Sequence, residues 1–196
     1  MKTNHDSDKP MNATTARLIT LCRAGDEAAI ESLVSTHQRS VYRLALSILE
    51  DPQEAEEAAQ DTLIAALAAL DTYRGDSAFT TWLHTITVNV CYSRLRKRRT
   101  LERLKNTLQS IFRTSGERLP HPEQTLIQNE SETAIWNAVH KLGDKHRLPI
   151  LLRYYHDYSV TEISQILGIN EGTVHSRLSI ARERLRSILG EERLRT

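Results

Sequence analysis

The stretch SVTEISQILGINEGTVHSRL, residues 159–178, decides the class of fold. Ser159, with Glu162 three residues later, is a capping-box pattern that predicts the start of a short helix. Gly168 suits the left-handed conformation that ends such a helix, and Asn170 can cap a second helix directly after it. A short helix, a glycine turn and a longer helix predict a helix-turn-helix. The alternative is a helical hairpin with a purely structural role.

The second helix of this motif has a narrow apolar face that must pack inward, made by Val174, Leu178, Ala181 and Leu185. Its other faces carry small polar groups between two basic edges. Such a helix suits the major groove of DNA, with its basic edges on the two phosphate backbones. We therefore expect the DNA contacts to come from His175, Ser176, Arg177, Ser179, Ile180 and Arg182.

Outward from this motif, the rest of the 196-residue chain is also predicted to be helical. Only 5% of the residues are aromatic, and no useful length of sequence alternates between apolar and polar residues as a strand would. Helical periodicity is interrupted between residues 100 and 130, where Ser115-Gly116, Pro120 and Pro122 are helix breakers. We predict an all-α fold in which a flexible linker joins two helical domains, the second with the helix-turn-helix. The expected boundaries are a disordered tail over 1–14, a first domain over 15–99, a linker over 100–130, a second domain over 131–190 and a tail over 191–196.

The charged residues are segregated along the chain, although the formal net charge is only +1. Residues 50–61 contain acidic residues and no basic ones, whereas residues 94–118 are strongly basic. Separate acidic and basic surfaces predict two different partners, one a basic protein and the other a polyanion.

The acidic block contains Asp51-Pro52-Gln53-Glu54, a sequence typical of a helix start. One face of the predicted helix is apolar and belongs to the core. The opposite face is acidic with an apolar residue within it, and it includes Glu57, Gln60, Asp61 and Ile64. We interpret this face as a partner-binding strip. A solvated face with one stray isoleucine is the alternative, because single exposed apolar residues are common.

A turn over residues 73–78 precedes a helix that begins near Phe79 and runs into the basic block. The outward side of this helix combines hydrogen-bonding, aromatic and basic residues, among them Trp82, Asn89, Tyr92 and Arg96. Aromatic rings can stack on unstacked bases while basic side chains follow the phosphates. This surface therefore suits single-stranded or distorted nucleic acid, with a solvated basic helix end as the alternative.

Several classes of protein are not indicated. The eight histidines include no pair at metal-ligand spacing and there is no glycine-rich phosphate loop, so we expect no metal, no cofactor and no enzymatic activity. His140, His146 and His156 are expected at the surface. We interpret Cys22 and Cys91 as small core residues of a protein in a reducing cytoplasm. Because no run of about 18 apolar residues occurs, neither membrane insertion nor a secretory signal is expected.

Three segments, in this order and spacing, resemble extracytoplasmic-function RNA polymerase sigma factors of the sigma-70 family. They are EAEEAAQDT at 54–62, LDTYRGDSAFTTWL at 70–83 and LGINEGTVHSRL at 167–178. The first is similar to the family's polymerase-binding segment, the second to its promoter-melting segment and the third to its recognition helix. The resemblance covers the chain from about Ala16 to Leu189 and implies that the two domains are sigma regions 2 and 4.

The resemblance implies a role for each candidate residue. Contacts to core RNA polymerase, which holds the beta and beta-prime subunits, would come from Glu57, Gln60, Asp61 and Ile64. Contacts to the −10 element of the promoter would come from Tyr73, Arg74, Asp76, Ser77, Trp82, Asn89, Tyr92 and Arg96. Contacts to the −35 element would come from the six residues of the recognition helix. The resemblance also implies an anti-sigma partner and work in the bacterial cytoplasm.

Two residues depart from the family pattern and bear on the −35 preference. The family often has a basic residue where His175 stands and an arginine where Ile180 stands. A stand-alone helix-turn-helix regulator is the alternative function, but it leaves the acidic strip and the 73–82 segment without a role. An enzyme that acts on nucleic acid is a third and weakly supported class.

Overall fold

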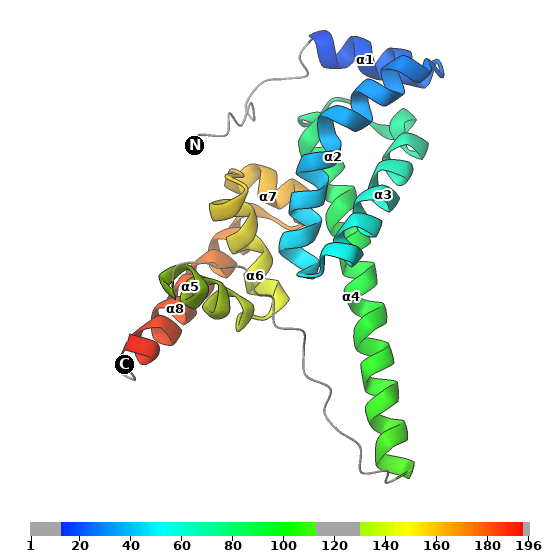
Figure 1. Cartoon of the computed structure of the whole chain (residues 1–196). Coiled ribbons are helices and arrows are strands. Elements are labelled where there is room, and N and C mark those ends of the chain that lie inside the picture. Colours follow the sequence, from blue (N-terminus) through cyan, green and yellow to red (C-terminus); the bar gives the residue numbers. More distant parts are fainter. Residues whose placement is uncertain (1–12, 113–129, 194–196) are drawn as a thin grey trace.

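The computed structural model describes residues 13–112 and 130–193, and every regular element within these ranges is helical (Figure 1). The predicted all-α fold is confirmed. The elements are α1 (Ala13–Arg23), α2 (Glu27–Leu49), α3 (Pro52–Ala68), the 3-10 turn η1 (Leu70–Thr72), α4 (Phe79–Phe112), α5 (Glu130–His140), α6 (Asp144–Ile150), the π-helical turn η2 (Leu151–Tyr155), α7 (Val160–Leu167) and α8 (Glu171–Arg193). Most of the predicted N-terminal tail, residues 113–129 of the predicted linker and residues 194–196 lie outside the described residues.

Two helices of the first domain, α2 and α3, begin with aspartate caps. Asp26 accepts a hydrogen bond from the backbone N–H of Ala29 at 2.9 Å, and Asp51 accepts one from Glu54 at 2.8 Å. Pro52 occupies the first turn of α3, where its missing N–H has no cost. The helix start that the sequence predicted at Asp51 is therefore confirmed. Helices α2, α3 and α4 pack side by side around a core of aliphatic residues that includes Val41, Leu44, Ala55, Ala58, Leu83 and Val88.

The helix-turn-helix forms as the sequence predicted. Ser159 and Glu162 make both hydrogen bonds of the capping box at the start of α7. Gly168 ends α7 with a φ of 61°, and Oδ1 of Asn170 accepts from the backbone N–H of Thr173 at 2.7 Å. The inward face of α8 is also confirmed, with Val174, Leu178 and Ala181 buried and Leu185 partly buried.

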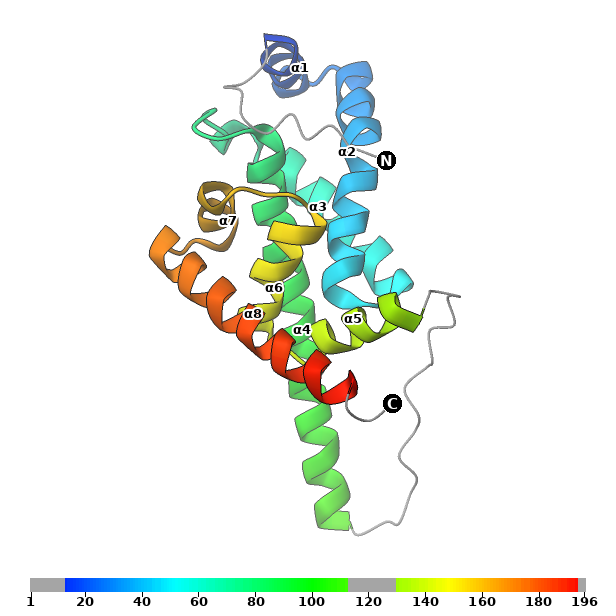
Figure 2. The same cartoon turned by 90° about the vertical axis from the view of Figure 1, so that its left-hand side faces the viewer.

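The two domains pack against each other, and both views place α7 alongside α4 (Figures 1 and 2). The first domain contributes Val88, Cys91 and Leu95 of α4 to a hydrophobic cluster that it shares with the second domain. From the second domain the same cluster contains Tyr158, Ile163 and Ile166. We call this packing the closed arrangement. It could not be predicted from either domain alone, because its contacts join residues far apart in sequence.

Polar contacts surround the apolar part of this interface. Arg147 of α6 pairs with Glu50 and donates a 2.9 Å hydrogen bond to the carbonyl of Ile48, at the end of α2. Arg99 pairs with Asp144 at 2.5 Å. A hydrogen bond between the hydroxyl of Tyr158 and Nδ1 of His84 is buried within the interface. The closed arrangement therefore combines apolar burial with paired charges.

Helix α4 runs beyond the expected boundary at residue 99. It continues to Phe112, so residues 100–112 of the predicted linker are helical. The sequence TLERLKNTLQSIF contains no glycine or proline, and most of its residues are good helix formers. No helix breaker therefore interrupts α4 up to Phe112. The lower part of α4 projects from the body of the molecule (Figure 1).

The histidine and cysteine predictions have different outcomes. His140 is exposed and His156 half-buried, but His146 is buried on α6 with Arg177 and Arg184 of α8 among its charged neighbours. The expectation of a surface position for His146 is wrong because α8 covers this side of α6. Both cysteines are buried, as predicted, and burial raises the pKa of the Cys91 thiol to about 12. No helix in the described ranges is long and apolar enough to cross a membrane.

Candidate nucleic-acid and partner interfaces

The acidic strip lies on the exposed side of α3. Glu57, Gln60 and Asp61 are exposed, and Ile64 has 67% of its surface accessible. The positions follow from helical spacing, which puts residues three and four apart on one face while the alanines opposite are buried. The sequence-predicted strip is therefore present as a continuous surface.

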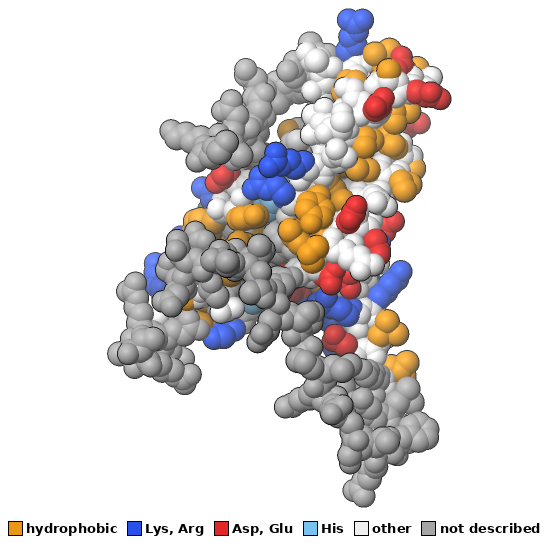
Figure 3. All heavy atoms as spheres, in the orientation of Figure 1, with side chains coloured by type: hydrophobic (Ala, Val, Ile, Leu, Met, Phe, Trp, Pro, Cys, Tyr) orange, Lys and Arg blue, Asp and Glu red, His pale blue; other side chains and the backbone are white. Residues whose placement is uncertain are grey.

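One basic residue of α4, Arg94, is paired with both acidic residues of this strip. Nη1 of Arg94 donates to Glu57 at 2.9 Å, and Nη2 donates to Asp61 at 2.5 Å. These hydrogen bonds raise the pKa of Arg94. The side chains of Glu57 and Asp61 remain more than half exposed, so each retains oxygen atoms that a partner can reach. In Figure 3 acidic side chains on the α3 side of the molecule lie directly above basic side chains of α4.

A shallow groove of about 700 Å³ runs between α3 and α4 beside the strip. Its lining mixes apolar residues such as Ile64 and Leu101 with charged ones such as Asp61 and Lys97. Leu101 is 66% exposed. The sequence reasoning missed it because Leu101 falls on the part of α4 that was expected to be linker. The groove has the mixed chemistry that suits an amphipathic helix of a partner protein.

The turn between η1 and α4 holds the first of the predicted −10 residues. Tyr73 is only 5% exposed; its hydroxyl donates to the carbonyl of Ser77 at 2.7 Å, and its ring packs edge-on against Phe79. The structure therefore places Tyr73 in the core, where it shapes the turn. Arg74 and Asp76 are exposed on the turn, and Ser77 is half-buried.

Arg23 of α1 holds this turn from the other side. Its Nη2 donates to the carbonyl oxygens of Leu70 at 2.9 Å and of Tyr73 at 2.6 Å, and its Nε lies 3.7 Å from a carboxylate oxygen of Asp71. No sequence pattern indicates this role, because Arg23 is about 50 residues away from the carbonyls that it binds. It fixes where the turn leaves η1.

In the closed arrangement the second domain covers part of the outward side of α4 and leaves the rest accessible. Asn89 and Arg96 are exposed, and Trp82 is half-buried with its ring 5.3 Å from that of Tyr73. Tyr92 is half-buried and lies beside a narrow gap lined by Asp144 and Arg147 of α6. Burial raises the pKa of Tyr92. Asn89 and Arg96 are therefore accessible, whereas the second domain partly covers Tyr92.

On α8 five of the six predicted residues face solvent, namely His175, Ser176, Ser179, Ile180 and Arg182. Ile180 has 38% of its surface accessible, a large value for an apolar side chain. Arg177 is half-buried and lies close enough to Tyr92 to influence its pKa. The outward side of α8 is thus a polar and basic surface with one isoleucine, as expected, while Arg177 turns toward the first domain.

Two family models match the chain, each on one of the domains. The first, described as sigma-70 region 2, matches residues 33–100, and the second, described as sigma-70 region 4, matches residues 132–185. The ECF RNA polymerase sigma factor SigM of Mycobacterium tuberculosis is 31% identical over 90% of this chain and 85% of its own length. The chain belongs to the ECF RNA polymerase sigma factors.

Other relatives agree with this assignment. The ECF sigma factor SigW of Bacillus subtilis is 31% identical and aligns over 85% of this chain and 92% of its own. The solved structure of the sigma factor RpoE in complex with the anti-sigma factor NepR, from Bartonella quintana, is 28% identical. The two structures align over 82% of this sigma factor and 96% of the RpoE chain, with a TM-score of 0.60. CnrH, solved with the cytosolic domain of CnrY, is 23% identical with a TM-score of 0.62 over 89% of this chain and 96% of its own, and it supports the fold.

Membership of this family makes the chain a transcription initiation factor, a class of protein that has no catalytic activity of its own. Within residues 13–112 and 130–193 no group of three or more histidine, cysteine or acidic side chains could hold a metal ion.

Proposed function

We propose that this sigma factor contacts its partners through three surfaces. The acidic strip of α3 binds core RNA polymerase, the 73–78 turn with the outward side of α4 binds the −10 element, and α8 binds the −35 element. The observation that carries the proposal is that each surface presents an accessible side chain from its own motif: Ile64, Asn89 and Ser179. It works in the bacterial cytoplasm, where the polymerase and promoter DNA are found.

Promoter binding requires the domains to separate. Elements at −10 and −35 are about 25 base pairs apart, which is roughly 85 Å along B-form DNA at 3.4 Å per base pair. Domains that share a hydrophobic cluster through Leu95 and Ile166 cannot reach both elements at once. The closed arrangement is therefore a state that precedes promoter binding, and the polymerase stabilises the open one.

An anti-sigma protein is a further partner of this chain. The supporting observations are the similarity to RpoE, which was solved with the anti-sigma factor NepR, and the exposed groove between α3 and α4. A protein that fills this groove would compete with core polymerase for Asp61 and Ile64.

A stand-alone regulator that binds duplex DNA without polymerase is the second candidate. It is favoured by one observation, that Ser176 and Ser179 of α8 are exposed in the closed arrangement and could reach a groove without domain separation. Electrophoretic mobility shifts with and without core polymerase distinguish the two candidates. The sigma function predicts specific promoter binding only when the polymerase is present.

A further inference from the structure

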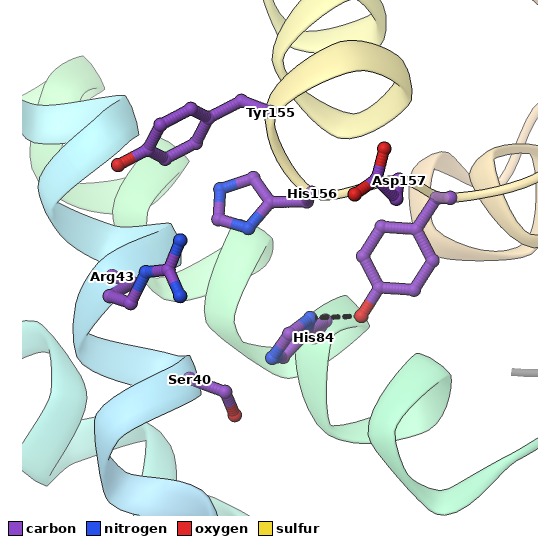
Figure 4. A pocket seen from close by; sticks show the side chains of 7 residues that line it. Ser40, Arg43, His84, Tyr155, His156 and Asp157 are labelled. Atoms are coloured by element: carbon purple, nitrogen blue, oxygen red, sulfur yellow. Dashed lines mark hydrogen bonds between the residues drawn. The ribbon is translucent and has the colours of Figure 1, made fainter. Parts of the chain in front are cut away.

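A hollow of about 160 Å³ opens where the two domains meet (Figure 4). Ser40 and Arg43 of α2 and His84 of α4 line it from the first domain, and residues 155–158 line it from the second. A single water needs only about 10–15 Å³ of such space. The hollow therefore has room for a small polar molecule, and neither domain can form it alone.

The lining is rich in hydrogen-bond donors. It contains the guanidinium of Arg43, the hydroxyl of Ser40 and the imidazoles of His84 and His156, while the hydroxyl of Tyr158 is engaged by Nδ1 of His84 (Figure 4). Asp157 is the one carboxylate among the lining residues, and in Figure 4 it lies across His156 from Arg43. Guanidinium, imidazole and hydroxyl groups that converge on one space suit an oxyanion, whose oxygens accept charge-assisted hydrogen bonds.

Neighbouring side chains hold Arg43 and His156 in place. The guanidinium carbon of Arg43 lies 5.7 Å from the centre of the Tyr155 ring, and that ring packs edge-on against Trp136. His156 is oriented by a 3.1 Å hydrogen bond between its Nε2 and the hydroxyl of Ser47. Donors that are already positioned lose less conformational entropy when a ligand binds.

We propose that this hollow binds a small oxyanion, such as inorganic phosphate or a phosphomonoester, and that the bound anion stabilises the closed arrangement. A ligand that contacts Arg43 from one domain and His156 from the other binds the closed state better than the open one. It must shift the equilibrium by its difference in affinity for the two states. The regulatory consequence, weaker engagement of polymerase and promoter, rests on the function proposed above, whereas the binding itself does not.

The first experiment measures anion binding to the full chain. Inorganic phosphate is titrated by isothermal calorimetry at an ionic strength held constant with chloride, and sulfate and glycerol 2-phosphate are separate arms. We expect saturable phosphate binding in the parent and binding about tenfold weaker or more in Arg43→Gln. Arg39→Gln is the matched control, since Arg39 is an exposed arginine one turn earlier on α2 that does not line the hollow. Binding that is absent, or equal in the parent and both variants, would overturn the site. Preference for glycerol 2-phosphate over phosphate and sulfate would identify a phosphomonoester as the ligand.

The second experiment measures the coupling to domain closure. The radius of gyration in solution, measured by small-angle X-ray scattering of the parent, should fall as phosphate saturates the site and should not change in Arg43→Gln. A radius that is insensitive to phosphate in a parent that binds it would overturn the coupling. Because neither experiment contains polymerase or promoter, failure of the sigma function would be seen separately, as absent transcription at zero phosphate.

Discussion

Nη2 of Arg94 lies 2.5 Å from Oδ2 of Asp61, across the groove between α3 and α4. The pair joins the acidic surface proposed for the polymerase to the basic helix proposed for promoter DNA. Exposed pairs of this kind stabilise a fold by at most about 1 kcal/mol. Asp61 can therefore be changed with little effect on folding, so a change in polymerase binding can be attributed to the strip itself.

Reversing two charges of the strip should weaken polymerase binding. For Glu57→Lys with Asp61→Lys we expect affinity for core polymerase to fall about tenfold or more, with a loss that shrinks at high salt. Fluorescence anisotropy with labelled protein measures it. Glu31→Lys with Glu56→Lys makes the same change in net charge at exposed positions outside the strip, and it should bind nearly as the parent does. Equal affinities for the two double variants would remove the strip from the polymerase interface.

Asn89 should contribute to opening of the promoter. Its amide is exposed on α4, the helix that directly follows the 73–78 turn. The amide can hydrogen-bond to the edge of an extruded base. We expect Asn89→Ala to reduce open-complex formation and to relax the preference at one −10 position. Permanganate footprinting measures the open complex, with Ser93→Ala, an exposed change one turn later, as the control. Unchanged footprints and unchanged −10 preferences would mean that Asn89 does not contact the −10 element.

Arg23 should act on the −10 element without touching it. Loss of its hydrogen bonds to the carbonyls of Leu70 and Tyr73 frees the turn that carries Arg74 and Asp76. We expect Arg23→Ala to slow open-complex formation severalfold while polymerase binding is unchanged, and Arg23→Lys to restore part of the rate. Arg17→Ala, on the same helix, is the control. A parallel loss of rate and thermal stability in both Arg23 variants would indicate a structural role alone.

Ile180 should set a preference within the −35 element. An apolar side chain on the outward face of α8 has no hydrogen bond to offer a base, and its best partner is the methyl group of thymine. We expect Ile180→Arg to bind promoters more tightly and to relax the thymine preference by about 1 kcal/mol. At position 175 a histidine presents at most two ring nitrogens to a phosphate, where an arginine would present a planar fork of five N–H donors. Promoter libraries selected with both proteins give the comparison. An unchanged −35 motif together with lost binding of an anti-sigma protein would show that Ile180 faces the inhibitor.

The closed arrangement should loosen when Arg147 is replaced. Its side chain is only 12% exposed and joins α6 to Glu50 and Ile48 at the end of α2. We expect Arg147→Met to increase the radius of gyration, because a smaller fraction of the protein is in the closed arrangement. Core polymerase binding should tighten, because binding then has to open fewer closed molecules. Lys145→Met, exposed on the same helix, should behave as the parent. A radius of gyration equal to that of the parent would mean that Arg147 does not hold the domains together.

Local features of the chain were predictable and long-range ones were not. The capping box at Ser159, the glycine at 168 and the exposed face of α3 follow from rules that act within one or two helical turns. Burial of Tyr73 depends on an irregular turn, where helical periodicity gives no direction for a side chain. The contact between His84 and Tyr158 joins two domains, and no pattern within either domain predicts it. Tyr92 was predicted to be on an open surface for the same reason, although α6 of the other domain partly covers it.

Transcription reconstituted from purified components tests the central claim most directly. Core RNA polymerase and this sigma factor are incubated with a library of genomic fragments, and the 5′ ends of the transcripts are sequenced. The sigma function predicts defined start sites with shared −10 and −35 motifs, and their loss when the sigma factor or the polymerase is omitted. Tight, sequence-specific binding of the protein alone to duplex DNA, with no new start sites when core polymerase is added, would contradict it.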